Sequence, residues 1–210
     1  KVLLLDANAD VTSNPALFTA AWANRYAGIV EYRPKHSLVD VDAKTKTLKF
    51  EFNDDIKADV LNVLPPMRAG SIAVKTGLAN MNGRWCEVDF LTFESKVAPN
   101  VHVIGDSIQV APLMPKSGHM ANQHGKTTAA AIVAILSGAE VNQMPIYNNT
   151  CYSFVSADDV IHVASVHRYD AEKRTMLTVP GAGGVSAAAN PLEGEYAKSW
   201  ARNIWADMLT

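Results

Sequence analysis

The residues best suited to chemistry lie together in the middle of the chain. Asp106 follows the apolar segment 101–104 and Gly105, and a proline-containing loop leads from it to Ser117. We expect a buried strand at 101–104 and a helix over residues 118–136. A carboxylate accepts hydrogen bonds from sugar or ribitol hydroxyls, and free N–H groups at a helix start attract negative charge. The pattern favours a pocket for a polyhydroxylated, anionic cofactor.

Two interpretations of this stretch stay open on the residues alone. An ordinary strand–loop–helix connection with a solvated aspartate has the same pattern. In the functional interpretation, the N–H groups at the helix start face a negative charge on the cofactor. In a flavin, that charge lies on the N1–C2=O2 edge of the reduced ring. Lys116 favours a functional role, because a cation at a helix start is unfavourable unless a negative group is near. Gly118, Ala121 and Gly125 recur at helical spacing and would let a backbone or a flat ring approach closely.

Other candidate motifs carry less weight. The two cysteines, Cys86 and Cys151, are too few for a disulfide scaffold, and a lone cysteine is most often a small buried hydrophobe. The six histidines include no pair with metal-ligand spacing, so no metal site is expected. Residues 181–184 contain three glycines but lack the G-x-G-x-x-G spacing, so we expect a turn there rather than a phosphate loop.

Composition is that of a folded globular protein. The 210 residues are 48% hydrophobic and 19% charged, enough for one large domain or two small ones. A net charge of −2 without a basic stripe gives no case for a nucleic-acid partner. No apolar run is long enough to span a membrane, since the stretch 127–136 is short and a helix stop follows it. The chain opens in an apolar strand, residues 1–5, which needs neighbours on both sides, so we expect a fragment of a longer protein.

Periodicity and turn residues predict a mixed α/β chain. The expected elements are strands at 1–5, 29–32, 37–41, 47–52, 59–64 and 101–104, helices at 15–26, 69–76 and 118–136, antiparallel strands at 151–155, 161–168 and 174–179, and a helix at 193–209. Asn14 and Pro15 are expected to cap and open the first helix. The pattern changes after Gly138, and we place a domain boundary near residue 140.

Segments that run through nearly the whole chain in order resemble the flavin subunit of flavocytochrome c sulfide dehydrogenase. The specific pair is Met-Pro-Lys-Ser-Gly at 114–118 and Asn-Thr-Cys-Tyr-Ser at 149–153, and further matching segments lie at 62–70, 85–89, 92–95, 102–106, 199–200 and 203–204. The resemblance implies an α/β chain. It would be part of a glutathione-reductase-like FAD/NAD-linked reductase fold, followed by a C-terminal α+β domain with antiparallel strands.

The same resemblance implies a division of the chain and a set of site residues. Residues 1–98 would be the latter part of a second nucleotide-binding-like domain, 99–140 the segment returning to the FAD-binding domain, and 141–210 the C-terminal flavin-binding and interface domain. The cofactor-binding residues would be Gly105, Asp106, Met114, Pro115, Lys116 and Ser117, and the catalytic residues Cys151 and Trp200. Asp106 would contact the ribitol–phosphate region of FAD, the 114–116 loop would cover the pyrimidine edge, and Cys151 would be half of a disulfide beside the flavin.

The implied activity is sulfide oxidation in the periplasm. Hydrosulfide would attack the disulfide, two electrons would pass to the flavin, and single electrons would pass on to a cytochrome c subunit. The dinucleotide-binding glycines and the second cysteine would lie upstream of residue 1, so the isolated chain is expected to be inactive.

Two alternatives remain. A sulfide:quinone reductase-like flavoprotein should carry an apolar terminal helix for membrane contact, but charged residues interrupt that helix here. A non-catalytic flavoprotein remnant that binds a sulfur-oxidation partner is the other alternative.

Overall fold

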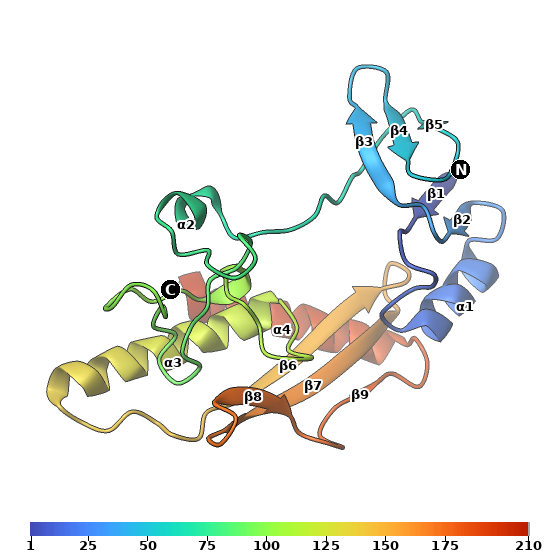
Figure 1. Cartoon of the computed structure of the whole chain (residues 1–210). Coiled ribbons are helices and arrows are strands. Elements are labelled where there is room, and N and C mark those ends of the chain that lie inside the picture. The colour runs from blue at the N-terminus through green and yellow to red at the C-terminus, as the bar shows by residue number, and fades with distance from the viewer. Residues whose placement is uncertain (210) are drawn as a thin grey trace.

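A computed structural model describes residues 1–209, which form three groups (Figure 1). The amino-terminal group contains β1 (Val2–Leu5), α1 (Pro15–Arg25), β2 (Val30–Arg33), β3 (Leu38–Asp42), β4 (Thr47–Phe50) and β5 (Ile56–Lys57). β1 and β2 pair in parallel, and β3, β4 and β5 form a small antiparallel sheet in that order. An extended segment at residues 58–68 leads to the middle loops, residues 69–117. These loops contain α2 (Ser71–Lys75) and the short 3-10 helix η1 (Gly105–Ser107).

The carboxyl-terminal group is an antiparallel sheet with two helices. It contains α3 (Gly118–Ser137), β6 (Ile146–Phe154), β7 (Val160–Asp170), β8 (Thr175–Thr178), β9 (Gly184–Val185) and α4 (Pro191–Leu209). β7 pairs with β6 along its length, from Ile146 opposite Arg168 to Phe154 opposite Val160, and with β8 and β9. In Figure 1, α4 runs behind β6 and β7, and α3 contacts β6. This arrangement confirms the predicted α/β class with antiparallel strands in the C-terminal part.

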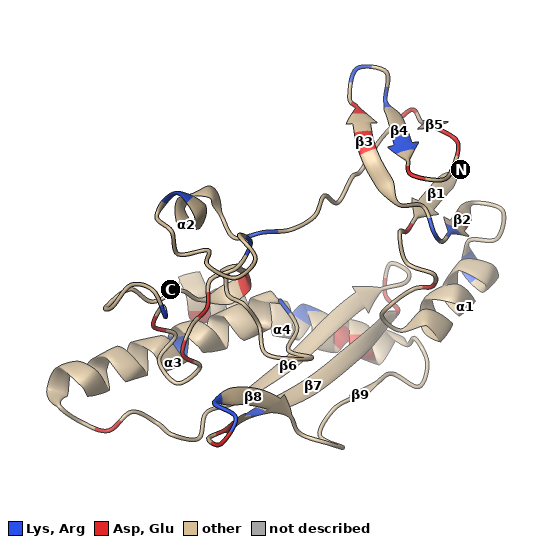
Figure 2. Ribbon diagram, in the orientation of Figure 1, with Lys and Arg blue, Asp and Glu red and all other residues tan. Residues whose placement is uncertain are grey.

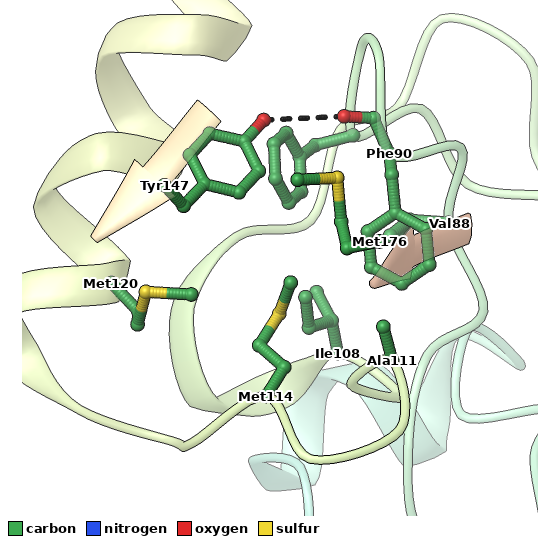
Figure 3. Close-up of a cluster of buried hydrophobic side chains, with 9 residues drawn as sticks. Val88, Phe90, Ile108, Ala111, Met114, Met120, Tyr147 and Met176 are labelled. Atoms are coloured by element: carbon green, nitrogen blue, oxygen red, sulfur yellow. Dashed lines mark hydrogen bonds between the residues drawn. The ribbon is translucent and has the colours of Figure 1, made fainter. Parts of the chain in front are cut away.

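The main core lies between the middle loops and the carboxyl-terminal group (Figure 3). Phe93, Ile108, Met120, Tyr147 and Met176 are fully or almost fully buried there, and they come from four different parts of the chain. The Tyr147 hydroxyl donates to the Phe90 carbonyl at 3.2 Å, so this polar group enters the core with its hydrogen bond satisfied. The loops that carry the candidate site residues are thereby held against α3 and the sheet.

A smaller contact joins the amino-terminal group to the sheet. Leu17 and Phe18 of α1 pack against the buried residues Ala21, Val155 and Ile161. Beside them, an Arg25 guanidinium nitrogen lies 2.6 Å from a carboxylate oxygen of Asp159. Positive and negative residues are interspersed over all three groups (Figure 2), and among residues 1–209 no helix has the length and apolarity needed to cross a membrane.

Two of the predicted strands are wrong. The 59–64 segment is not a strand, and the side chains of Val60 and Leu64 are 83% and 87% exposed. Residues 101–104 are also irregular, with a single bridge from His102 to Glu94. Both segments have the apolar composition of strands, but a strand needs a continuous neighbour to satisfy its backbone groups. No pairing is found for residues 59–64 within the described chain, and residues 101–104 meet residues 93–95 through only the one bridge. The buried strand expected before Asp106 is therefore an extended loop.

The predicted helices and the C-terminal strands are confirmed, with boundaries shifted by a few residues. α3 begins at Gly118 as predicted, and Pro15 opens α1. The predicted side-chain cap at Asn14 is wrong. This residue adopts a left-handed conformation with φ of 48°, and its side chain makes no capping hydrogen bond. Residues 181–184 form the predicted glycine turn, which leads into β9.

The glycine turn generates a stability prediction. A Cβ atom at Gly183 would overlap the Ala164 carbonyl oxygen on β7, whereas a Cβ atom at Gly184 meets nothing within 4 Å. We expect Gly183→Ala to lower the free energy of unfolding by about 2 kcal/mol, because backbone atoms must move to admit the methyl group. Urea unfolding of Gly183→Ala beside the matched variant Gly184→Ala measures this. Equal stability of the two variants would contradict the close packing of this turn.

Candidate functional site at the amino end of α3

Ser117 joins the start of α3 to β6. Its hydroxyl oxygen accepts the Met120 N–H at 3.1 Å, the usual N-cap interaction of a serine. The same hydroxyl donates to Oδ1 of Asn149 on β6 at 2.5 Å. The N–H groups of Gly118 and His119 have no hydrogen-bond partner among residues 1–209. This helix end therefore carries the partial positive charge of free N–H groups and favours an anion.

Cys151 lies two residues beyond Asn149 on the same strand. Its sulfur accepts a hydrogen bond from Nδ2 of Asn149 at 3.3 Å, so it is linked through Asn149 and Ser117 to the start of α3. Cys151 is a free, partly buried thiol. Cys86 is also free but fully buried, in a separate cluster with Ala69 and Ala73. No disulfide forms among residues 1–209.

Trp200 reaches the same helix end from the other side of β6. Its ring lies 5.7 Å from the His119 ring and 6.2 Å from the Tyr152 ring, measured between centroids. Tyr152 follows Cys151, and successive strand side chains point to opposite faces, so Trp200 lies on the face away from the sulfur. Burial lowers the pKa of His119, and its neutral Nδ1 accepts the Thr150 N–H at 3.1 Å.

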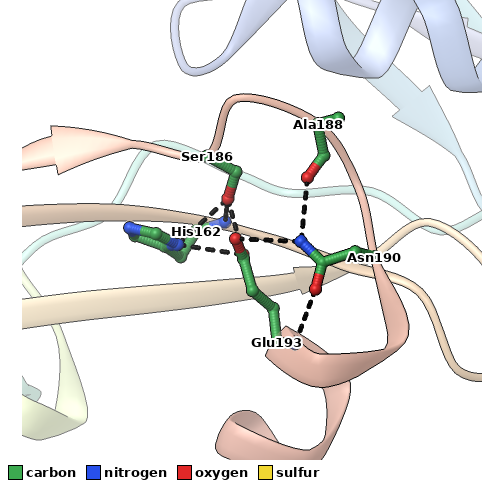
Figure 4. Close-up of polar contacts among 5 residues, drawn as sticks. All are labelled: His162, Ser186, Ala188, Asn190 and Glu193. Atoms are coloured by element: carbon green, nitrogen blue, oxygen red, sulfur yellow. Dashed lines mark hydrogen bonds and ion pairs between the residues drawn. The ribbon is translucent and has the colours of Figure 1, made fainter.

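A hydrogen-bond network fixes the helix that carries Trp200 (Figure 4). Asn190 precedes α4, and its Oδ1 accepts the Glu193 N–H at 3.0 Å. The Glu193 carboxylate accepts the Ser186 hydroxyl at 2.6 Å and contacts Nδ1 of His162 at 2.9 Å. Burial opposes ionisation of Glu193, but these hydrogen bonds outweigh it and lower the carboxyl pKa.

This serine, histidine and acid do not form a hydrolytic triad. Ser186 and Glu193 both reach Nδ1 of His162, whereas a triad uses the two ring nitrogens separately. Ser186 is also buried, and its oxygen accepts the His162 backbone N–H at 2.7 Å. The network anchors α4 to β7 and thereby positions Trp200.

The η1 loop packs directly on α3. Gly105 has φ of +66°, and a Cβ atom there would lie 3.3 Å from the Cβ atom of Ala121. The close approach predicted from the small residues of α3 is thus confirmed for Ala121, with the loop backbone as the neighbour. The Gly105 N–H donates to Nδ1 of His124 at 3.3 Å. The carboxylate of Asp106 is exposed and has no hydrogen-bond or ion-pair partner among residues 1–209.

The structure places Lys116 and Met114 differently from the expected cofactor contacts. The Lys116 ammonium donates to the carbonyls of Asp106 and Ile108 at 2.7 and 2.6 Å and lies 3.8 Å from the Trp85 ring centroid. Burial lowers its pKa. It braces the η1 loop, a role that the sequence did not indicate. The Met114 side chain is buried in the main core, because the loop turns it inward, so it packs there rather than facing the amino end of α3.

Pro115 and Ser117 are partly exposed at the amino end of α3, and Gly118 beside them is exposed. The predicted residues Gly105, Asp106 and Cys151 come close to this helix end through the contacts above, and Trp200 reaches it through His119. Asn149 was missed as a site residue, although it lies within a recognised segment. Its importance arises from a tertiary contact with Ser117, which no local pattern reveals.

Two family models match the chain. Residues 143–209 match the model described as flavocytochrome c sulphide dehydrogenase, flavin-binding. Residues 1–65 match the central model of the sulfide dehydrogenase [flavocytochrome c] flavoprotein chain. The chain belongs to this flavoprotein family. It is also 30% identical over 132 residues to the mitochondrial sulfide:quinone oxidoreductase of Mus musculus, a match covering 56% of this chain and 29% of the relative.

Solved structures share the fold. The sulfide:quinone oxidoreductase of Aquifex aeolicus superimposes with a TM-score of 0.71 at 12% identity, covering 97% of this chain and 49% of that one. A chain of the Tetrahymena thermophila mitochondrial ATP synthase gives a TM-score of 0.59 at 17% identity, covering 78% and 40%. The chain therefore spans about half the length of the Aquifex oxidoreductase and less than a third of the mouse relative. The division at residues 98 and 140 stays a prediction.

FAD is the cofactor of this flavoprotein family, and the donor set at α3 fits part of it. An unpartnered carboxylate at Asp106 suits the ribityl hydroxyls, and the free N–H groups of Gly118 and His119 suit the electron-rich pyrimidine edge. The sequence contains no G-x-G-x-x-G loop for the pyrophosphate. The residues present would therefore hold one edge of FAD rather than the whole cofactor.

His124 generates a pH prediction. Burial, together with the charge of Lys116, lowers the pKa of His124 to about 4, below the usual value for an unfolded chain. The unfolded state therefore binds a proton first as the pH falls. The stability contributed by neutral His124 is complete above about pH 6.5 and is lost as the pH falls towards 4, by about 3 kcal/mol in all.

Urea unfolding of the wild type and of His124→Gln between pH 7 and pH 4 measures this contribution. Burial also lowers the pKa values of His119 and His167, so both proteins lose stability in acid. The variant should lose less of it than the wild type. Parallel pH profiles would contradict a neutral, buried His124.

Proposed function

We propose that this chain is part of a flavoprotein that oxidises sulfide and passes the electrons to a c-type cytochrome. The chain supplies the groups that hold one edge of the flavin and the cysteine sulfur that reacts. The observation that carries the proposal is the hydrogen-bonded connection from Cys151 through Asn149 and Ser117 to the free N–H groups of α3. It brings a partly exposed sulfur to the helix end where an anionic ring edge would bind. The family match supports the cytochrome partner, and the resemblance supports a periplasmic location.

The sulfur chemistry needs a disulfide that includes Cys151. Hydrosulfide would attack one sulfur of that disulfide, forming a new S–S bond while the old one breaks and the other cysteine leaves as a thiolate. Cys86 does not suit the second position because it is fully buried in another cluster. We therefore assign that position to a cysteine supplied from outside residues 1–209.

The protein groups at α3 would orient the reactants. When bound, FAD accepts an electron pair and releases single electrons to a haem partner. Gly118 and His119 would stabilise negative charge on its pyrimidine edge, and Asp106 would accept hydrogen bonds from its ribityl chain. Asn149 would hold the sulfur of Cys151.

A quinone is the second candidate electron acceptor. The mouse and Aquifex relatives are sulfide:quinone oxidoreductases by name. The last turns of α4 expose Trp205, Met208 and Leu209, which suit contact with an apolar surface. Against this, Asp207 lies in the same turns and pairs with Lys126 on α3 at 2.8 Å. Assaying the FAD-loaded flavoprotein with cytochrome c and with a soluble quinone distinguishes the two acceptors.

Replacing Cys151 tests the proposed sulfur chemistry. We expect Cys151→Ser in the FAD-loaded flavoprotein to slow sulfide-dependent bleaching of the flavin by roughly a hundredfold or more, because no disulfide remains for hydrosulfide to attack. Stopped-flow absorbance measures the rate, and Cys86→Ala is the matched control that should retain it. Bleaching at the wild-type rate in Cys151→Ser would exclude the proposed role.

Replacing Asp106 tests the proposed ribityl contact. Asp106→Ala should raise the Kd for FAD by about tenfold, since one charge-assisted hydrogen bond is lost. Asp54→Ala is the control, because Asp54 is exposed in the turn that follows β4. Quenching of flavin fluorescence on binding gives both constants. Equal constants for the two variants would remove Asp106 from the cofactor site.

A further inference from the structure

We propose that Asn149 is a positioning residue for the Cys151 sulfur. Its hydrogen bonds extend the polarisation of the partly positive start of α3 to that sulfur and favour the thiolate. Ser117 is the intermediate link. The inference rests on the proposed role of Cys151, but its test needs neither sulfide nor flavin.

The direction of the hydrogen bonds supports this coupling. The Ser117 oxygen accepts the Met120 N–H at 3.1 Å, so the single hydroxyl hydrogen is free to donate to Asn149 Oδ1 at 2.5 Å. This contact places the amide oxygen towards the serine and the amide nitrogen towards the sulfur. Nδ2 donates to Cys151 Sγ at 3.3 Å, whereas the thiol itself donates to Oδ1 only at the longer distance of 3.8 Å. The shorter of the two contacts is therefore the one in which the amide donates to the sulfur.

Burial increases the effect of this arrangement. Asn149 is only 3% exposed, and hydrogen bonds in a low-dielectric setting are strong and polarise one another. A hydrogen bond to an ionised acceptor is stronger than one to a neutral acceptor, so an N–H donor stabilises the thiolate more than the thiol. The thiolate is the reactive form of cysteine in disulfide chemistry.

Docking of α3 on β6 does not depend on Asn149 alone. The Gln123 side chain donates to the Asn148 carbonyl at 2.5 Å and accepts the Asn148 N–H at 3.0 Å. His119 adds a hydrogen bond from the Thr150 N–H at 3.1 Å. If Asn149 only joined α3 to β6, it would duplicate these contacts. The Cys151 sulfur is the partner that distinguishes Asn149 from Gln123 and His119.

Charged groups near β6 do not provide the same stabilisation. The titratable side chains that α3, β7 and α4 bring to this part of the strand are His119, His162, Glu193 and Tyr196, the last two of which act on Tyr152. His162 pairs with Tyr152 in the strand register and contacts Glu193, on the face away from the sulfur. His119 uses Nδ1 to accept a backbone N–H and packs on Trp200. A change in Cys151 reactivity on replacing Asn149 would therefore report the amide itself.

Alkylation of Cys151 by iodoacetamide across a pH series tests the proposal, with the modified peptide identified by mass spectrometry. We expect Asn149→Leu to raise the pH of half-maximal alkylation by about one unit, because one hydrogen bond to the thiolate is lost. Asn149→Asp should raise it further, since a carboxylate then faces the sulfur. Ser117→Ala should shift it in the same direction by less. The matched control Asn148→Asp adds the same charge at an exposed neighbouring residue and should shift it least.

Thermal unfolding of each variant separates this role from simple packing. If Asn149→Leu and Asn149→Asp keep the wild-type pH profile while their melting temperatures fall, Asn149 has only a packing role and the proposal is wrong. If Asn149→Leu does not fold, Ser117→Ala decides the question by the same criterion, because it removes the link from α3 without adding a charge beside the sulfur. Failure here would leave the flavin-bleaching result for Cys151→Ser unaffected, so the two proposals can fail separately.

Discussion

The hydroxyl of Ser117 is the contact on which the candidate site depends. It accepts a hydrogen bond from the first turn of α3 and donates one to Asn149 on β6, so a single oxygen joins the helix start to the residue that contacts Cys151. Serine suits this position because its hydroxyl is both a donor and an acceptor. Without it, Gln123 and His119 would still join α3 to β6, but the link through Asn149 between the start of α3 and the sulfur of Cys151 would be lost.

The surrounding structure holds that contact in place from several directions. Gly105 packs on Ala121 and hydrogen-bonds to His124, which keeps Asp106 beside the helix end. Lys116 ties the η1 loop down by donating to two backbone carbonyls. On the far side of β6, the network around Glu193 fixes the start of α4. The site is thus assembled from loops and helix ends that rigid elements support, a common arrangement for functional residues.

The sequence predicted correctly those helices and strands that periodicity and turn residues define. The long helix of small and apolar residues and the alternating C-terminal strands were confirmed because periodicity and turn residues define them. Residues 59–64 and 101–104 were predicted wrongly, because a strand depends on distant neighbours that periodicity cannot supply. The same limit explains the inward-facing Met114, the bracing role of Lys116 and the missed contribution of Asn149. Each depends on a tertiary contact between segments far apart in the chain.

In the proposed site, the amino end of α3 would hold one edge of FAD, and the chain spans about half the length of the Aquifex oxidoreductase whose fold it shares. FAD is the cofactor of the family, and the proposed position of its ring rests on the geometry at α3. A crystal structure of the FAD-bound flavoprotein tests this most directly. The account predicts the N1–C2=O2 edge of the flavin at the N–H groups of Gly118 and His119, with the Cys151 sulfur beside the ring. A first turn of α3 covered by protein side chains, with Cys151 remote from the ring, would contradict it.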